Sequence, residues 1–122
     1  MTEYKSAEDY LEAILIVKER EGRCRSVDVA RQLGFSKPSV SVAITKLEKS
    51  GLLKKEADGE LVLTDAGNAL AGEVLEKHRF LTHLLTGLGV PADIAEQDAC
   101  AMEHNLSEES FAALKKLQIE PC

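Results

Sequence analysis

The sequence predicts a mainly α-helical protein in two parts, residues 1–64 with one short β-hairpin and residues 65–122 built wholly from helices. Three observations lead to this class. Apolar residues recur at the three- and four-residue spacing of helices along most of the chain. Ser, Pro and Gly stand where these patterns start and stop. Asp58-Gly59 lies between two apolar-bearing runs, which is a strong hairpin signal.

The first two predicted helices are separated by a short basic segment. Residues 7–21 form the first helix, because apolar side chains recur at helical spacing and Gly22 ends the pattern. Its core positions are Leu11, Ile14, Leu15 and Val17. Ser26 is expected to cap the second helix, which stops at Gly34.

The third predicted helix completes a helix-turn-helix pattern. Ser36 is expected to be its N-cap, Pro38 suits its first turn, and Gly51 follows its end. Two helices joined by a short Gly-containing turn, the second rich in Ser, Thr and Lys, are typical of a helix-turn-helix. The hairpin directly after it makes a winged helix. The alternative is a small helical domain with an incidental turn.

The second part is predicted to contain three more helices. A long one runs from Thr64 or Asp65 to about Leu85, Pro91 suits the first turn of a fifth, and Ser107 can cap a sixth. This part is too small to bury its apolar faces alone. We therefore expect it to form a dimer interface.

Charge is distributed unevenly along the chain. The formal net charge is −6 and the isoelectric point is near 5.1, which taken alone argues against a nucleic-acid partner. Between Arg23 and Lys55, however, eight basic residues face two acidic ones, a local net charge of +6. An acidic protein therefore contains a basic segment of the kind that binds DNA.

The sequence predicts a cytoplasmic protein. No apolar run approaches the roughly 20 residues of a membrane span, and the first residues lack the apolar core of a signal peptide. Cys24, Cys100 and Cys122 are an odd number without paired spacing, so we expect free or metal-binding thiols in a reducing compartment.

Three potential metal ligands share one face of the predicted fifth helix. Cys100, Glu103 and His104 stand at positions i, i+3 and i+4, so thiol, carboxylate and imidazole project together. A complete site needs groups from other elements, and the candidates are Asp9, Glu12 and His78. Glu96, one turn before Cys100, could add a carboxylate. Taken singly, each residue also has an ordinary interpretation, such as a buried small cysteine, a solvated carboxylate or an exposed histidine.

Four runs of residues together resemble a known family. They are Glu8-Asp9-Tyr10-Leu11-Glu12, Ser36-Lys37-Pro38-Ser39-Val40-Ser41, Lys77-His78-Arg79 and Asp98-Ala99-Cys100-Ala101-Met102-Glu103-His104-Asn105-Leu106-Ser107. The chain resembles, over nearly its whole length, the metal-dependent repressors of the diphtheria toxin repressor family. The resemblance implies a winged helix-turn-helix joined to a helical dimerisation domain. It also implies Fe(II) or Mn(II) between the first, fourth and fifth helices, and a short two-domain form without the C-terminal SH3-like domain.

By position, the resemblance implies six metal ligands, with Glu96 as an additional candidate: Asp9, Glu12, His78, Cys100, Glu103 and His104. Asp9 with Glu12 is similar to the manganese-sensing branch, and Cys100 to the iron-sensing branch. Because thiolate sulfur favours Fe(II), Co(II) or Zn(II) over Mn(II), the expectation leans to iron. Co(II), Zn(II) or Ni(II) are expected to substitute in vitro. The iron branch has an ancillary site with glutamate at the position of Thr82 and histidine at that of Glu96, so that site is either absent or rearranged here.

The resemblance and the basic segment together give a hypothesis for DNA binding. One third helix from each subunit of a homodimer enters the major groove of a palindromic double-stranded operator. Val42 occupies the position where the iron branch reads a base with glutamine, so it can at most touch a thymine methyl. The candidate DNA-binding residues are Arg25, Ser36, Lys37, Pro38, Ser39, Ser41, Val42, Lys46, Lys49, Lys54 and Lys55. Arg23 would add phosphate neutralisation beside Arg25.

The resulting interpretation is a non-enzymatic, metal-dependent transcriptional repressor that controls metal-homeostasis genes. One alternative is a metal-independent winged-helix regulator that senses a small molecule, although aromatic residues for a pocket total only 4%. Another is a small metallohydrolase using Glu103 as base beside Cys100 and His104. It lacks a separate nucleophile and a Gly-rich oxyanion loop.

Overall fold

The computed structural model describes the backbone of residues 2–117 and the side chains of residues 7–117. In chain order it contains α1 (Thr2–Glu21), α2 (Ser26–Leu33), α3 (Lys37–Lys49), β1 (Leu53–Lys55), β2 (Leu61–Leu63), α4 (Asp65–Gly87), α5 (Ala92–Glu103) and α6 (Glu108–Lys115). The predicted mainly helical class is confirmed. Pro121 and Cys122, the predicted end of the second part, lie outside the described residues. Among the helices that the structure describes, none is long and apolar enough to cross a bilayer.

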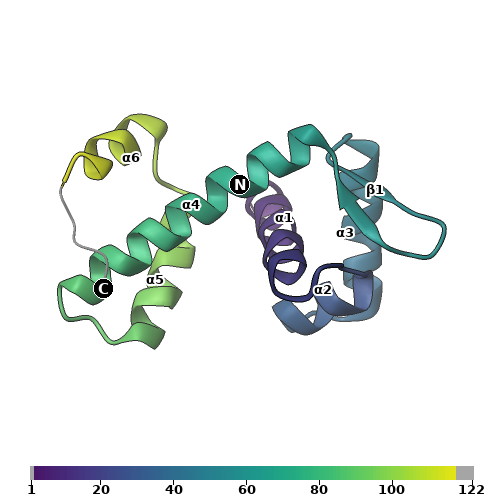
Figure 1. The fold of residues 1–122 in the computed structure, drawn as a ribbon, viewed down its shortest axis with the longest axis horizontal. Coiled ribbons are helices and arrows are strands. Elements are labelled where there is room, and N and C mark those ends of the chain that lie inside the picture. Colours follow the sequence, from purple (N-terminus) through teal and green to yellow (C-terminus); the bar gives the residue numbers. More distant parts are fainter. Residues whose placement is uncertain (1, 118–122) are drawn as a thin grey trace. The chain divides into compact units, whose positions relative to one another are not determined.

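The chain forms two compact units, which divide between Gly72 and Glu73. The first unit contains α1 to α3, the hairpin and the first turns of α4, and the second contains the rest of α4 with α5 and α6 (Figure 1). One continuous helix, α4, therefore belongs to both units. The predicted boundary between residues 64 and 65 stays a prediction about domains.

The first unit is a winged helix-turn-helix with one hydrophobic core. α1 and α2, α2 and α3, and α3 and β1 pack against each other. The core is made of buried aliphatic side chains, each contributing about 1.5–3 kcal/mol by its removal from water. They include Leu11, Ile14, Val17, Val29, Val40, Ile44, Leu47, Leu53 and Leu61. The apolar residues that recur at helical spacing in the sequence therefore lie on the faces with which these helices pack against each other.

The termini of α3 follow the prediction, whereas two other helix starts do not. The Ser36 hydroxyl accepts a 3.3 Å hydrogen bond from the backbone N–H of Ser39, which confirms Ser36 as the N-cap of α3. The N-cap of α2 is Arg25 and not Ser26, because Asp28 accepts a 2.9 Å hydrogen bond from the backbone N–H of Arg25. α1 begins at Thr2 and not at residue 7, since its polar first turn continues the helix without adding to the apolar period.

The hairpin forms the wing and is held by the segment before α2. β1 and β2 pair antiparallel, with Leu53 opposite Leu63, and Gly59 adopts a φ of +92° in the predicted turn. The backbone N–H of Leu61 donates a 2.8 Å hydrogen bond to the carbonyl oxygen of Cys24. This bond attaches the wing to the residue that precedes Arg25.

The start of α4 is fixed to the end of α3 and the beginning of the wing. The Thr64 hydroxyl donates a 2.7 Å hydrogen bond to the carbonyl oxygen of Gly51 and accepts one of 3.1 Å from the backbone N–H of Gly67. The Thr64 N–H donates a 3.1 Å bond to the carbonyl oxygen of Leu52. A Cβ at Gly67 would collide with that same Leu52 carbonyl oxygen. Thr64 therefore caps α4 and joins it to α1, α2, α3 and the hairpin, which together are called the reading head below.

The second unit is held by packing between α4 and the two following helices. The rings of Phe80 and Phe111 meet edge to face with centroids 5.5 Å apart, and the Lys115 ammonium lies 4.6 Å from the Phe111 centroid. Ser107 is the N-cap of α6, as predicted. Pro91 is the N-cap of α5, one residue before the predicted first-turn position. The contact between Phe80 and Phe111 connects α4 to α6.

We expect Gly67→Ala to lower the free energy of unfolding by about 1–3 kcal/mol, because the added methyl group meets backbone that can move only if the Thr64 joint opens. The measurement is urea denaturation followed by circular dichroism. Gly72→Ala is the matched control: a Cβ there has no atom within 4 Å, and the change should stabilise the helix by up to about 1 kcal/mol. Equal stability of the two variants would contradict the assigned role of Gly67.

Candidate metal centre and nucleic-acid interface

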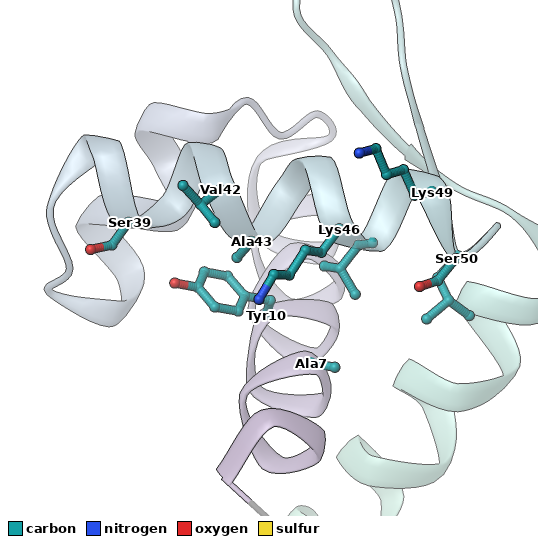
Figure 2. A pocket seen from close by; sticks show the side chains of 10 residues that line it. Ala7, Tyr10, Ser39, Val42, Ala43, Lys46, Lys49 and Ser50 are labelled. Carbon is teal, nitrogen blue, oxygen red and sulfur yellow. The ribbon is translucent and has the colours of Figure 1, made fainter.

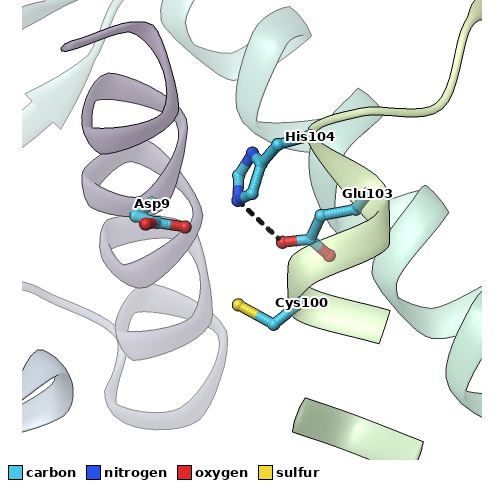
Figure 3. Close-up of side chains that lie close together, drawn as sticks. All are labelled: Asp9, Cys100, Glu103 and His104. Carbon is cyan, nitrogen blue, oxygen red and sulfur yellow. Dashed lines mark ion pairs between the residues drawn. The ribbon is translucent and has the colours of Figure 1, made fainter. Parts of the chain in front are cut away.

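Four ligand-capable side chains come together in the second unit. His78 is on α4, Cys100 and Glu103 are on α5, and His104 is the C-cap of α5 with helical backbone angles. The ligand atoms of Cys100, Glu103 and His104 lie within 4.8 Å of one another, and those of His78 and Glu103 are within the same limit. Figure 3 shows the Cys100, Glu103 and His104 side chains close together. The predicted i, i+3, i+4 face of the fifth helix is therefore present in the fold.

Glu103 is the centre of this group. The residue is 2% exposed, and its two carboxylate oxygens face two different imidazoles. Oε2 lies 2.9 Å from Nδ1 of His78, and Oε1 lies 3.4 Å from Nε2 of His104. Within the described residues, Oε1 accepts no hydrogen bond of good geometry. Burying a carboxylate costs several kcal/mol unless positive charge and hydrogen bonds compensate it.

The donor set fits a divalent transition-metal ion. A thiol sulfur, a carboxylate oxygen and two imidazole nitrogens are the donors that Fe(II), Co(II) and Zn(II) accept, and the carboxylate also suits Mn(II). The orphaned Oε1 of Glu103 is a buried acceptor that a cation would satisfy. In the second unit, Cys100 and His104 lie near Glu103 in one candidate ligand group, and His78 lies near Glu103 in another.

The three remaining predicted ligands are on α1 and α5. Asp9 and Glu12 belong to α1 of the first unit, where their spacing of three residues places both carboxylates on one side of the helix. Glu12 is only 8% exposed. Glu96 is one turn before Cys100 on α5 but is exposed, and it belongs to neither metal-ligand group found among the described residues.

The predicted DNA-binding residues form an exposed set on the first unit. All of Arg25, Ser36, Lys37, Pro38, Ser39, Ser41, Val42, Lys46, Lys49, Lys54 and Lys55 are exposed. The three buried residues of α3 are Val40, Ile44 and Leu47, so α3 packs with one face and presents the other to solvent. Val42, 58% exposed, is the large apolar side chain of that outer face. The arrangement suits insertion of α3 into a groove.

Arg23 differs from its neighbours, because acidic residues of the wing pair with it. Its guanidinium lies 2.8 Å from Asp58 and 3.6 Å from Glu60. A hydrogen bond from the backbone N–H of Glu60 holds the pKa of Asp58 below its ordinary value, and the Arg23 charge acts in the same direction. Arg23 therefore helps to hold the wing, in addition to its predicted contribution to phosphate binding.

A hollow of about 630 Å³ lies between α1 and α3 in the first unit (Figure 2). Its lining includes Ala7, Tyr10, Ser39, Val42, Lys46 and Lys49. Burial, together with the negative charge of Asp9, raises the pKa of Tyr10. Tyr10 is not among the site residues predicted from the sequence. The sequence does show an aromatic residue next to Asp9. Because successive helix residues point about 100° apart, its side chain leaves α1 in a different direction from that of Asp9.

A winged helix-turn-helix combined with a buried carboxylate, a half-buried thiol and two imidazoles is typical of a metal-responsive DNA-binding regulator. A family model described as the N-terminal DNA-binding domain of iron-dependent repressors matches residues 4–61. A second, described as their metal-binding and dimerisation domain, matches residues 64–121. The chain belongs to this family of metal-dependent transcriptional repressors, whose members are DNA-binding proteins and not enzymes.

Individual relatives include both manganese and iron regulators. The transcriptional regulator MntR of Escherichia coli O157:H7 is 37% identical over 108 residues, which are 88% of this chain and 70% of the relative. The iron-dependent repressor IdeR of Mycobacterium tuberculosis H37Rv is 34% identical, over 95% of this chain and 51% of the relative.

Solved structures of an IdeR protein and of a manganese-dependent repressor are also similar to this chain. The crystal structure of T. acidophilum IdeR has a TM-score of 0.80 at 28% identity, covering 94% of this chain and 55% of that one. A manganese-dependent transcriptional repressor in complex with manganese has a TM-score of 0.81 at 30% identity, covering 89% and 50%. The chain thus spans about half the length of these two structures.

Cys24 is a buried cysteine of the first unit and differs chemically from Cys100. It is 0% exposed, and burial, aided by the nearby Asp28 charge, raises the pKa of its thiol to about 12. Cys100 is half-buried within the ligand group. Since the thiolate is both the nucleophile and the metal ligand, Cys24 is an apolar core residue and not a reactive one.

We expect Cys24 of the native protein to resist iodoacetamide at pH 8. A pKa of about 12 in place of 9.0 leaves about a thousandfold less thiolate at that pH. Mass spectrometry of peptides measures the rate, using a protease other than trypsin because Arg23 and Arg25 flank the cysteine. The same thiol in guanidinium chloride is the control and should react at an ordinary rate. Rapid native labelling would show that the loop around Cys24 opens readily.

Proposed function

We propose that the chain acts as a homodimeric transcriptional repressor in the cytoplasm that binds operator DNA when Fe(II) or Mn(II) is bound. The observation that carries this proposal is the buried Glu103 carboxylate, which lies between two imidazoles beside a cysteine. The exposed basic and polar residues of α3 and the wing support the DNA-binding half. The family membership supports the combination of the two.

The proposed ligands are Asp9, Glu12, His78, Cys100, Glu103 and His104. His78, Cys100, Glu103 and His104 form the second-unit part, and the family resemblance assigns Asp9 and Glu12 to the same centre. When bound, the cation supplies positive charge and a fixed set of coordination bonds. Glu96, which is exposed, is proposed only as a ligand of a rearranged additional site.

Different ligand atoms of the proposed site favour different metals. The soft sulfur of Cys100 favours Fe(II), with Co(II), Zn(II) or Ni(II) as substitutes in vitro. The carboxylates Asp9, Glu12 and Glu103 favour Mn(II). Relatives named for iron and for manganese are both similar to this chain. We therefore propose Fe(II) as the first metal to test and Mn(II) as the second.

The proposed mechanism connects ligand residues of the first unit to those of the second. Asp9 and Glu12 lie on α1, whose Leu11, Ile14 and Val17 belong to the core that also supports α3. Holding Asp9 and Glu12 against the second-unit ligands restricts how the reading heads of a dimer are spaced. By linkage, a metal that tightens DNA binding must itself bind more tightly when DNA is present.

The second unit is proposed as the dimer interface. Several large apolar side chains of this unit are exposed in the single chain, and burying them against a second copy would remove them from water. They are Leu88 (74% exposed), Ile94 (46%), Met102 (38%) and Leu117 (55%). The matching family model is described as a metal-binding and dimerisation domain.

In the proposed complex, α3 lies in the major groove. Ser36, Pro38 and Ser39 lie near base edges and phosphates at its N-terminal end, and Val42 touches a thymine methyl. Lys46, Lys49, Lys54 and Lys55 neutralise phosphates, so affinity should fall steeply with salt.

We expect Cys100→Ala and His104→Ala to abolish metal-dependent operator binding while the dimer survives. Each change removes a ligand without altering α3 or the exposed apolar residues of the second unit. Fluorescence anisotropy measures binding to a duplex enriched from a random library by the metal-loaded protein. Sedimentation reports the dimer, and Co(II) absorption reports metal binding without DNA.

Glu96→Gln is the matched control, because Glu96 lies on the same helix but is exposed and outside the ligand group. It should keep the primary metal response. An unchanged response in both Cys100→Ala and His104→Ala would overturn the ligand assignment. Loss of the dimer in both would instead give these residues a structural role.

A further inference from the structure

The hollow between α1 and α3 opens beside the face of α3 that carries the predicted DNA-binding residues. Ser39, Val42 and Lys46 line it from α3, and Ala7 and Tyr10 line it from α1 (Figure 2). All ten lining residues belong to the first unit, and none of them is acidic. The hollow is therefore a basic and partly apolar recess in the reading head itself.

Tyr10 lies with its ring in the core and its hydroxyl directed into the hollow (Figure 2). The residue is 6% exposed, and its ring packs edge to face on Phe35 with centroids 5.9 Å apart. No hydrogen bond to its hydroxyl is found among the side chains of residues 7–117. Since a tyrosine hydroxyl can donate one hydrogen bond, an acceptor group placed in the hollow can take it.

The lining matches the chemistry of a DNA backbone phosphate. Lys46 and Lys49 supply positive charge, and Tyr10 and Ser39 supply hydroxyl donors. Ala43 and Leu47 supply an apolar wall suited to the edge of a deoxyribose. Half to two-thirds of protein–DNA hydrogen bonds go to phosphate and sugar, and a helix in the major groove is flanked by the two backbones.

We propose that this hollow receives one backbone phosphate in each operator half-site, with the Tyr10 hydroxyl donating a hydrogen bond to it and Lys46 neutralising it. This inference rests on the proposed function. It makes Tyr10 a DNA-contacting residue that α1 positions. Because Asp9 precedes it directly and Glu12 follows two residues later, whatever holds these carboxylates also holds the Tyr10 hydroxyl at its phosphate.

The test is Tyr10→Phe, which keeps the ring in the core and removes only the hydroxyl. In the presence of metal, we expect operator affinity to fall about tenfold, the effect of losing one hydrogen bond to a charged group. Binding in chelator should change less than twofold, because the two reading heads of the dimer are then not held at operator spacing and the Tyr10 hydroxyl is not brought to its phosphate. The thermal unfolding midpoint and the Co(II) absorption should be unchanged. If the hydroxyl had a merely structural role, its loss would lower the unfolding midpoint.

A scan of single methylphosphonate substitutions in the operator locates the phosphate. At one position in each half-site, the neutral group should weaken the wild type about tenfold and weaken Tyr10→Phe much less. Lys46→Gln should lose sensitivity at the same position and reduce the slope of log affinity against log salt by about one. Lys115→Gln removes the same charge from the second unit, in a residue paired with Glu76, and should reproduce the wild-type scan.

The outcomes separate this inference from the proposed function. If the wild type binds DNA with metal but Tyr10→Phe matches it in affinity and in the scan, the phosphate assignment is wrong and the repressor proposal stands. If the wild type shows no metal-dependent DNA binding, the proposed function is wrong. The phosphate assignment, which rests on it, is then wrong as well. Equal weakening of Tyr10→Phe in metal and in chelator would reject the link through α1.

Discussion

The buried carboxylate of Glu103 is the constraint on which the account of this protein depends. α5 places it beside Cys100 and His104, and α4 brings His78 to within 2.9 Å of its other oxygen. Such a group is costly to bury, and its Oε1 lacks a well-formed hydrogen bond within the described residues. In the proposed function, a bound divalent cation offsets that cost. Glu103 is then the residue through which metal binding acts on the second unit.

The reading head is held together by contacts of its own. Its core of aliphatic side chains holds α1, α2 and α3 together, and the Thr64 joint fixes the first turn of α4 to the end of α3. Because α4 is one helix from Asp65 to Gly87, the helix that carries His78 starts at that joint. A restraint on α1 or α4 therefore acts on the reading head as a whole. Gly67 permits the close approach of α4 to Leu52 on which the joint depends.

Most elements were predictable because their signals are local. Ser36 and Ser107 cap helices through their own side chains, and Asp58-Gly59 defines a turn within four residues. Arg25 displaced Ser26 as the cap of α2, because the stabilising bond comes from Asp28 and not from the cap side chain.

The site was predictable only in part. Cys100, Glu103 and His104 follow from helical spacing, whereas the approach of His78 to Glu103 needs the packing of α4 on α5. The hollow at Tyr10 depends on how α1 crosses α3, and no single segment encodes it. The net charge of −6 does not indicate the basic segment between Arg23 and Lys55, because acidic residues elsewhere in the chain outweigh its charge.

The most direct test of the central claim is a titration of DNA binding by chelator-treated wild-type protein. Fe(II) under anaerobic conditions, Mn(II), Co(II) and Zn(II) are added in turn to the protein with its enriched operator duplex, and anisotropy is recorded. The account predicts weak, salt-sensitive binding in chelator and at least about a tenfold gain in affinity with the cognate metal, corresponding to a coupling within the usual allosteric range. Equally tight, sequence-specific binding in chelator and in every metal would contradict it.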